Sequence, residues 1–253
     1  MSESKVTALV TGASAGLGLE FCRQLATRCD VLIAVARRRE RLEQLADELS
    51  GQVETHVLEA DLGTIEGVAK VMEALRQKGP VDILVNNAGF STVGKFADLD
   101  IDGQRDMLSL HCDATMTLCR AAIPFMRERG SGSIINVSSL SAFIPAKGLA
   151  TYAATKVFLN HFSQALNAEL FGSGVEVQAL CPGYIHTEFH DGMAELGFDK
   201  SRVPQEMWSS PKEVVTASLR ALGSGQVLVV PGDNNRALAR AGIENLLAQL
   251  GES

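Results

Sequence analysis

The chain has no cysteine pair with the Cys-x-x-Cys spacing that is common in metal and redox sites. Its five cysteines, an odd number, are scattered along the 253 residues. This pattern indicates reduced thiols and not a disulfide framework, so we expect a cytoplasmic protein. The apolar run over residues 6–10 is too short for a signal peptide or a membrane span.

The chain also lacks a surplus of positive charge. Its 23 Lys and Arg are outnumbered by 30 Asp and Glu, for a net charge of −7. The longest run of like charge is only Arg37-Arg38-Arg39. These features argue against a surface for nucleic acid or for an anionic membrane. With no internal repeat, low-complexity tract or linker, residues 1–253 are expected to form a single domain.

Short β-branched runs alternate with helical patterns along the first half, which predicts βαβ units and a parallel sheet. We therefore expect an α/β fold of the doubly wound Rossmann type, with a seven-stranded, mostly parallel sheet and helices on both faces. The expected strands are residues 6–10, 31–36, 53–58, 81–85, 133–137, 175–180 and 226–230. The expected helices are residues 19–28, 37–49, 65–75, 104–129 and 152–171, with a helix over 237–250 in a C-terminal tail of 236–253. Residues 182–211 show no periodicity and are expected to be irregular, with a substrate lid over 183–211.

A glycine-rich turn, Thr11-Gly12-Ala13-Ser14-Ala15-Gly16-Leu17-Gly18, follows the first expected strand and opens the first helix. Glycines let the backbone turn tightly and approach a pyrophosphate, which then meets the free N–H groups of the helix start. The spacing is G-x-x-x-G-x-G and not the commoner G-x-G-x-x-G, and a purely structural turn is the alternative. Its place between strand and helix favours dinucleotide binding. The predicted contacts are Gly12, Ser14, Ala15, Gly16, Leu17 and Gly18.

The end of the second expected strand predicts which dinucleotide binds. An NAD site usually has an Asp or Glu there to accept hydrogen bonds from the ribose. This chain has Ala36 followed by Arg37 and Arg38, whose guanidinium groups suit a 2′-phosphate. We predict NADP(H) as the cofactor, with a basic helix start as the alternative.

Tyr152 and Lys156 are four residues apart in an expected helix, so their side chains lie on one face. The pKa of a free tyrosine is about 10, too high for easy proton exchange at neutral pH. The Lys156 cation is expected to lower the pKa of Tyr152 and make it a general acid or base. Alone, this pair is also compatible with an ordinary surface helix.

Several motifs occur in the order and spacing of one family. They are the glycine-rich turn, Asp61-Leu62, Asn86-Asn87-Ala88-Gly89, Ser139 thirteen residues before Tyr152, and Pro182-Gly183 with Thr187. Together they make the chain resemble the short-chain dehydrogenase/reductase family, its single-domain branch, over residues 5–232.

The resemblance implies a role for each matched residue. Ser139 would hydrogen-bond the substrate oxygen, Tyr152 would transfer the proton, and Lys156 would lower the pKa of Tyr152 and bind the nicotinamide ribose. Asn86 would brace the sheet. The other implied cofactor contacts are Asp61 and Leu62 at the adenine, Asn87, Ala88 and Gly89 along the cofactor, and Pro182, Gly183, Ile185 and Thr187 near the nicotinamide.

One residue departs from the family pattern. The family usually has an Asn thirteen residues before a Pro of the long helix, and counting back from Pro124 gives His111. That Asn is thought to hold a water that connects the lysine to solvent. A neutral histidine has both a donor and an acceptor for a related role, so His111 is a fourth catalytic candidate. The alternative is a buried histidine whose hydrogen bonds are satisfied without a catalytic role.

The sequence contains two weaker patterns. His186 and His190 are four residues apart, but they fall in an expected loop with no third ligand, so we expect no metal. His190 is instead expected to face the substrate. Cys112, Cys119 and Cys181 are interpreted as small core residues. The expected substrate contacts, largely apolar, are Phe90, Leu140, Phe143, Tyr184, Met193, Leu196, Met207 and Trp208.

These expectations describe an NADP(H)-dependent oxidoreductase that interconverts an apolar ketone or aldehyde and its alcohol. We expect it to bind neither nucleic acid nor a membrane. The family resemblance implies a homodimer or homotetramer formed through the helices of residues 104–129 and 152–171. One alternative is a cofactor-binding sensor or scaffold whose catalysis is impaired because His111 replaces the usual Asn. Another is an NAD-linked alcohol dehydrogenase in which the arginines only solvate a surface turn.

Overall fold

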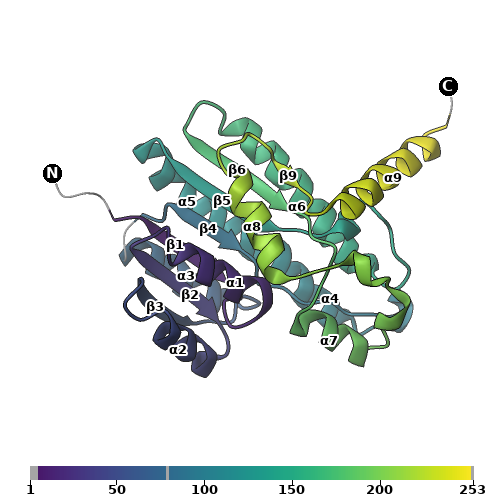
Figure 1. The fold of residues 1–253 in the computed structure, drawn as a ribbon, viewed down its shortest axis with the longest axis horizontal. Helices are drawn as coiled ribbons and strands as arrows, with labels where there is room; N and C mark the ends of the chain where they lie inside the picture. The colour runs from purple at the N-terminus through teal and green to yellow at the C-terminus, as the bar shows by residue number, and fades with distance from the viewer. Residues whose placement is uncertain (1–4, 78–79, 252–253) are drawn as a thin grey trace.

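The computed structural model describes residues 5–77 and 80–251 as a sheet with helices on both faces (Figure 1). The main sheet of the described residues contains β1 (Thr7–Thr11), β2 (Val31–Ala36), β3 (Glu54–Glu59), β4 (Ile83–Asn86), β5 (Gly132–Val137), β6 (Val175–Leu180) and β9 (Leu228–Val229). Its strand order is β3-β2-β1-β4-β5-β6-β9, and its pairings are all parallel. The predicted doubly wound Rossmann fold is confirmed, and the sheet is parallel throughout instead of mostly so.

Apolar runs account for the central strands. All six residues of β2 are buried, as expected for a strand that is covered on both faces. The other predicted strands lie within a few residues of their expected places. The largest difference is at β9, which is limited to Leu228–Val229, inside the expected span of 226–230.

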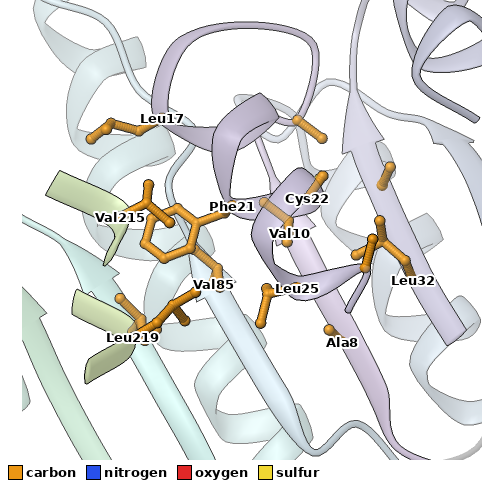
Figure 2. Packing of buried hydrophobic residues seen from close by; sticks show 14 of the residues in the cluster. Ala8, Val10, Leu17, Phe21, Cys22, Leu25, Leu32, Val85, Val215 and Leu219 are labelled. Carbon is orange, nitrogen blue, oxygen red and sulfur yellow. The ribbon is translucent and has the colours of Figure 1, made fainter. Parts of the chain in front are cut away.

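Helices α1 (Gly16–Leu25), α2 (Arg39–Glu48) and α8 (Pro211–Ala221) pack on one face of the sheet. Figure 2 shows Phe21 of α1 between Val215 and Leu219 of α8, above Val85. We did not predict α8, although it begins with a recognisable signal. Ser210 and Glu213 form a capping box there, and a proline occupies the first turn.

Helices α3 (Ile65–Gln77), α5 (Ala114–Arg129) and α6 (Ala150–Glu169) belong to the other face. Their apolar side chains, such as Val71, Leu118 and Met126, are fully or nearly fully buried against the strands. The two hydrophobic clusters hold the sheet between them. Packing on both faces therefore fixes the carboxyl ends of the strands and the loops that follow them.

The expected helical stretch over 104–129 is confirmed, although it is not a regular α-helix throughout. The structure has α4 (Ile101–Leu108), then a π-helical segment, η2 (Ser109–Asp113), and then α5. Single π turns within helices are frequent at functional sites. This one contains His111, so the irregular backbone coincides with the residue that departs from the family pattern.

The stretch over 182–211, expected to be irregular, is irregular only in part. It contains α7 (Glu188–Glu195), a small parallel sheet of β7 (Tyr184–Ile185) and β8 (Trp208–Ser209), and the 3-10 turns η4 (Lys200–Arg202) and η5 (Gln205–Met207). His190 consequently lies on a helix and not in a loop. The tail helix α9 (Asp233–Gln249) begins four residues before its expected start and projects from the body (Figure 1). Among the described residues, no helix is long and apolar enough to cross a membrane.

The order of the strands reverses at β1, which has β2 on one side and β4 on the other. Open α/β sheets bind ligands beyond the carboxyl ends of their strands at such a reversal. Thr11, the last residue of β1, joins the two strand ends, because its Oγ1 accepts hydrogen bonds from the N–H groups of Asn87 (2.8 Å) and Ala88 (3.0 Å). The glycine-rich turn therefore lies beside the segment that follows β4.

Candidate active site

Helix α6 brings Tyr152 and Lys156 together, as their spacing predicts. Both side chains are buried. Lys156 Nζ lies 5.4 Å from the centroid of the Tyr152 ring and donates a hydrogen bond to the backbone oxygen of Val137 at 2.9 Å. Val137 ends β5, so the lysine also ties α6 to the sheet.

Ser139 approaches the same place from the end of β5. It precedes the short turn η3 (Leu140–Ala142), and its Oγ accepts a hydrogen bond from the N–H of Ser141 at 3.1 Å. A hydrogen bond with Ser139 also favours the phenolate form of Tyr152. Three of the four predicted catalytic residues, Ser139, Tyr152 and Lys156, thus converge at the carboxyl end of β5.

The expected effect of Lys156 on Tyr152 is wrong for this structure. Burial raises the pKa of Tyr152 to about 12, and the hydrogen bond with Ser139 only opposes that rise. The ammonium lies beside the ring and its hydrogen bond goes to Val137, so it does not offset the lost solvation of a phenolate. Burial also lowers the pKa of Lys156 to about 8. In this state Tyr152 is a protonated donor at neutral pH.

His111 forms a hydrogen-bonded link between two parts of the site. Its Nε2 accepts from the N–H of Phe90 at 3.1 Å, and its Nδ1 lies 2.9 Å from Thr155 Oγ1. Because Nε2 accepts, Nδ1 carries the proton and donates to Thr155. Thr155 Oγ1 in turn donates to the backbone oxygen of Tyr152 at 2.7 Å. Burial and then the Lys156 charge lower the pKa of His111 well below its ordinary value, which keeps the imidazole neutral.

Replacing His111 by Asn is expected to lower the free energy of unfolding by about 1–3 kcal/mol. The shorter amide cannot reach both Phe90 and Thr155, so one buried partner loses its hydrogen bond. Thr155→Val removes the link from the other end. Urea unfolding of the single variants and the double variant tests this, and the double variant should cost less than the sum of the two. Additive costs would contradict a shared link.

The glycine-rich turn has the close backbone contacts that a dinucleotide site requires. Gly12 has φ 67°, and a Cβ placed there would lie 2.6 Å from Asn87 Nδ2. A Cβ at Gly18 would lie 2.2 Å from the backbone oxygen of Gly12. Ala15 precedes α1 without a side-chain cap, so the first N–H groups of this helix meet no capping side chain. Such a turn fits a pyrophosphate.

The remaining predicted cofactor residues surround this turn. Asn87 Nδ2 donates to the backbone oxygen of Thr11 at 2.8 Å. Thr187 lies against the turn, since a Cβ at Gly16 would be 3.4 Å from Thr187 Cγ2. Leu17, Leu62, Pro182 and Ile185 are buried, whereas Asp61 and Gly89 are exposed. Asn86, expected to brace the sheet, does so by donating to Asn136 Oδ1 at 2.8 Å.

The two predicted arginines differ in their surroundings. Arg38 turns toward the glycine-rich turn and donates from Nε and Nη2 to Ser14 Oγ at 3.2 and 3.1 Å. Arg37 points outward, with 77% of its side chain exposed and its Nη1 3.8 Å from Asp61 Oδ2. Glu188 lies 3.0 Å from Arg38 and 2.5 Å from Arg41. Of the two, Arg38 is the better placed to hold an anion at the turn.

Residues 184–208 carry an aromatic cluster next to Tyr152. Phe189 of α7 lies 6.0 Å from the Tyr152 ring, between centroids. Behind it, His190 packs against Tyr184, Phe198 and Trp208 at 5.8, 6.3 and 5.3 Å. His190 Nδ1 is buried without a hydrogen-bond partner, and burial lowers the pKa of His190 to about 4.

Among the expected substrate contacts, Leu140 and Met193 are buried and Leu196 is 52% exposed. A cavity of about 310 Å³ opens beside α7 and is lined by His186, Thr187, Glu188, Asp191, Lys200, Gln205 and Trp208. Its lining residues all lie within 186–208 and do not include Ser139, Tyr152 or Lys156. In the described part of the chain, no three His, Cys, Asp or Glu side chains gather as metal ligands would.

Four residues near the site were not predicted from the sequence: Arg41, Thr155, Glu188 and Phe189. Arg41 follows Arg37 and Arg38 by one helical turn, and this spacing is a signal that could have identified it. Glu188 has no such signal, because it is 147 residues from Arg41. Cys119 and Cys181 are buried as expected, but Cys112 is only partly buried.

Known proteins of similar sequence and structure share one family. Residues 6–195 match the family described as short chain dehydrogenase. A very-long-chain 3-oxoacyl-CoA reductase of Anas platyrhynchos is 32% identical over 222 residues, 85% of this chain and 68% of that protein. A short-chain dehydrogenase of Sphingobium yanoikuyae, solved in complex with NADPH, has a TM-score of 0.84 and 32% identity, covering 98% of this chain and 96% of that one. A bulky-bulky ketone specific alcohol dehydrogenase of Comamonas testosteroni has a TM-score of 0.80 and 29% identity, covering 96% and 94%.

Proposed function

Since this chain belongs to the short-chain dehydrogenase family, whose members are oxidoreductases with a nicotinamide cofactor, we propose that it is an NADP(H)-dependent carbonyl reductase. The observation that carries this proposal is the convergence of Ser139, Tyr152 and Lys156 at the carboxyl end of β5, on the same side of the sheet as the glycine-rich turn that follows β1. The substrate is an apolar ketone or aldehyde, and the product is the alcohol. The structural neighbour that was solved with NADPH supports the choice of cofactor.

The residues of this chain have defined tasks in that reaction. The bound cofactor supplies the hydride. Ser139 donates a hydrogen bond to the carbonyl oxygen and orients it, and Tyr152 donates the proton to that oxygen. Lys156 holds positive charge beside Tyr152, which reduces, without fully offsetting, the cost of the buried phenolate that proton donation leaves. His111 positions the first turn of α6 through Thr155, whose hydroxyl donates a hydrogen bond to the backbone oxygen of Tyr152.

The walls near Tyr152 favour an apolar substrate. Phe189 packs against the tyrosine ring on one side, and His111 lies 5.9 Å from it on another. Leu140, directly after Ser139, is buried. The names of two similar proteins, a bulky ketone alcohol dehydrogenase and a long-chain 3-oxoacyl-CoA reductase, support ketones with large apolar groups.

Replacing Arg38 by Gln tests the cofactor assignment. We expect NADPH to bind about tenfold more weakly or worse, because a charge-assisted hydrogen bond to a 2′-phosphate is lost. NADH, which lacks that phosphate, should bind unchanged. Arg39→Gln is the matched control, since Arg39 pairs with Glu43 on its own helix. Calorimetric titration with both cofactors decides the matter, and an equal loss for NADPH and NADH would contradict a 2′-phosphate site at Arg38.

We also propose that the protein is a cytoplasmic homodimer or homotetramer. All five cysteines are unpaired, which fits a reducing compartment. Apolar side chains are exposed on the two helices through which the family resemblance implies association, namely Met116 and Phe125 of α5 and Val157 of α6. A mass of one chain by light scattering would reject the oligomer.

A further inference from the structure

A carboxylate of the lid joins two arginines at the end of the sheet where the cofactor is proposed to bind. Glu188 Oε2 accepts from Arg38 Nη1 at 3.0 Å, and Glu188 Oε1 accepts from Arg41 Nη1 at 2.5 Å. The arginines follow β2, whereas Glu188 begins α7. We call these three side chains the Glu188 bridge. The arginines, Arg41 first, lower the pKa of Glu188, which therefore stays ionised at neutral pH.

The bridge spans the glycine-rich turn. On one side, Arg38 donates to Ser14 Oγ, which belongs to the turn. On the other, Thr187 lies against Gly16 of the same turn. The first turn of α7 is consequently held down over the backbone that would face a pyrophosphate. The position of α7 thus depends on whether Glu188 or another anion is bound to the two arginines.

A change at the start of α7 would reach the reacting groups and the lid. Phe189, next to Glu188, packs on the ring of Tyr152. His190 contacts Trp208 at 5.3 Å, and Trp208 stacks on His186 at 4.9 Å with an 18° interplanar angle. Both histidines flank Glu188 within two residues. The environment of Trp208 therefore reports on the bridge.

The bridge is weak enough to be exchanged. The side chains of Arg38, Arg41 and Glu188 are 46%, 42% and 53% exposed. Ion pairs at such positions stabilise a protein only slightly, because water screens them. A phosphate monoester carries a charge of about −1.5 to −2 at neutral pH and has three acceptor oxygens, against a single charge on Glu188. It competes favourably for the same guanidinium groups.

We propose that Glu188 competes with the 2′-phosphate of the cofactor for Arg38 and Arg41, so that a 2′-phosphate, and not a bare ribose, releases the first turn of α7. Glu188 is then a specificity-determining residue, because the position of the lid depends on whether the bound cofactor carries a 2′-phosphate. This inference rests on the proposed NADP(H) function. By linkage, whatever stabilises the bridge weakens binding of the 2′-phosphate by the same factor.

The test uses 2′,5′-ADP as the probe and 5′-AMP, which lacks the 2′-phosphate, as its control. Trp208 is the one tryptophan of the chain, so its emission is an unambiguous signal. We expect 2′,5′-ADP to change the emission of the wild-type protein at saturation and 5′-AMP to leave it unchanged. Glu188→Gln should bind 2′,5′-ADP about two- to fivefold more tightly, since no ion pair must be broken, and should show little further change in emission.

Glu43→Gln is the matched control. It removes an exposed carboxylate from α2, but its partner is Arg39 and not an arginine of the bridge. It should match the wild type in affinity and in emission. Unchanged or weaker binding of 2′,5′-ADP by Glu188→Gln would overturn the competition. If the wild type binds both probes equally, the NADP(H) proposal fails and the inference fails with it; a preference for 2′,5′-ADP that is independent of Glu188 overturns the inference alone.

Discussion

Tyr152→Phe is expected to reduce kcat for carbonyl reduction by about 10²- to 10⁴-fold, the usual contribution of a positioned proton donor. The variant removes one hydroxyl and keeps the ring, so the contacts with Phe189 and Lys156 remain. NADPH should still bind, because the glycine-rich turn and Arg38 are untouched. Steady-state kinetics and calorimetry on the same preparation separate the two effects.

Tyr184→Phe is the natural control, since Tyr184 is the other tyrosine of the chain. Its ring stacks on that of Phe198, with 5.8 Å between centroids, and a phenylalanine keeps that contact. We expect most of kcat to remain, with any effect confined to KM. Retention of activity in Tyr152→Phe would show that another group, and not Tyr152, is the proton donor.

Lys156→Met is expected to make the cofactor-free protein more stable while reducing its activity. Burial lowers the pKa of Lys156 from 10.5 to about 8, so the charged side chain destabilises the fold at neutral pH. A depression of that size corresponds to about 3 kcal/mol. Loss of the hydrogen bond to Val137 lowers the free energy of unfolding by about 1 kcal/mol, so the variant is expected to be more stable by about 2 kcal/mol. Without the cation, kcat should fall about 100-fold.

The pH dependence distinguishes this cause from better packing. The unfolded chain keeps the Lys156 proton up to about pH 10.5, whereas the folded protein releases it above about pH 8. The wild type therefore gains stability relative to Lys156→Met as pH rises from 8 to 10.5. Urea unfolding at pH 7, 8.5 and 10 should show the advantage of the variant shrinking. A constant advantage at all three values would show that the buried charge is not its origin.

Much of the fold could be predicted because local patterns and tertiary burial agree. The apolar run of β2 occupies residues 31–36 both in the prediction and in the structure, since it is buried on both faces. The four-residue spacing of Tyr152 and Lys156 placed both on one face of α6, and the glycine-rich turn opens α1 as expected. In each case the determining interactions lie within a few residues in the sequence.

What could not be predicted depends on contacts between distant segments. The short strands β7 and β8 form because Tyr184 pairs with Trp208, and a two-residue strand is too short to show a periodicity in the sequence. The π turn at His111 is stabilised by hydrogen bonds to Phe90 and Thr155, which come from other elements. The pKa of Tyr152 is raised and not lowered as the sequence predicts, because the spacing indicates a neighbouring cation but not the burial of the phenol. Glu188 meets its arginines only in the folded chain.

The most direct test of the account is the consumption of NADPH by the wild-type protein in the presence of a panel of bulky apolar ketones and 3-oxoacyl thioesters. We predict steady oxidation of NADPH with at least one ketone, formation of the matching alcohol, and a much slower reaction with NADH at the same concentration. Tight binding of NADPH without turnover across the panel would contradict the assignment as a carbonyl reductase and would favour a cofactor-binding protein without catalysis.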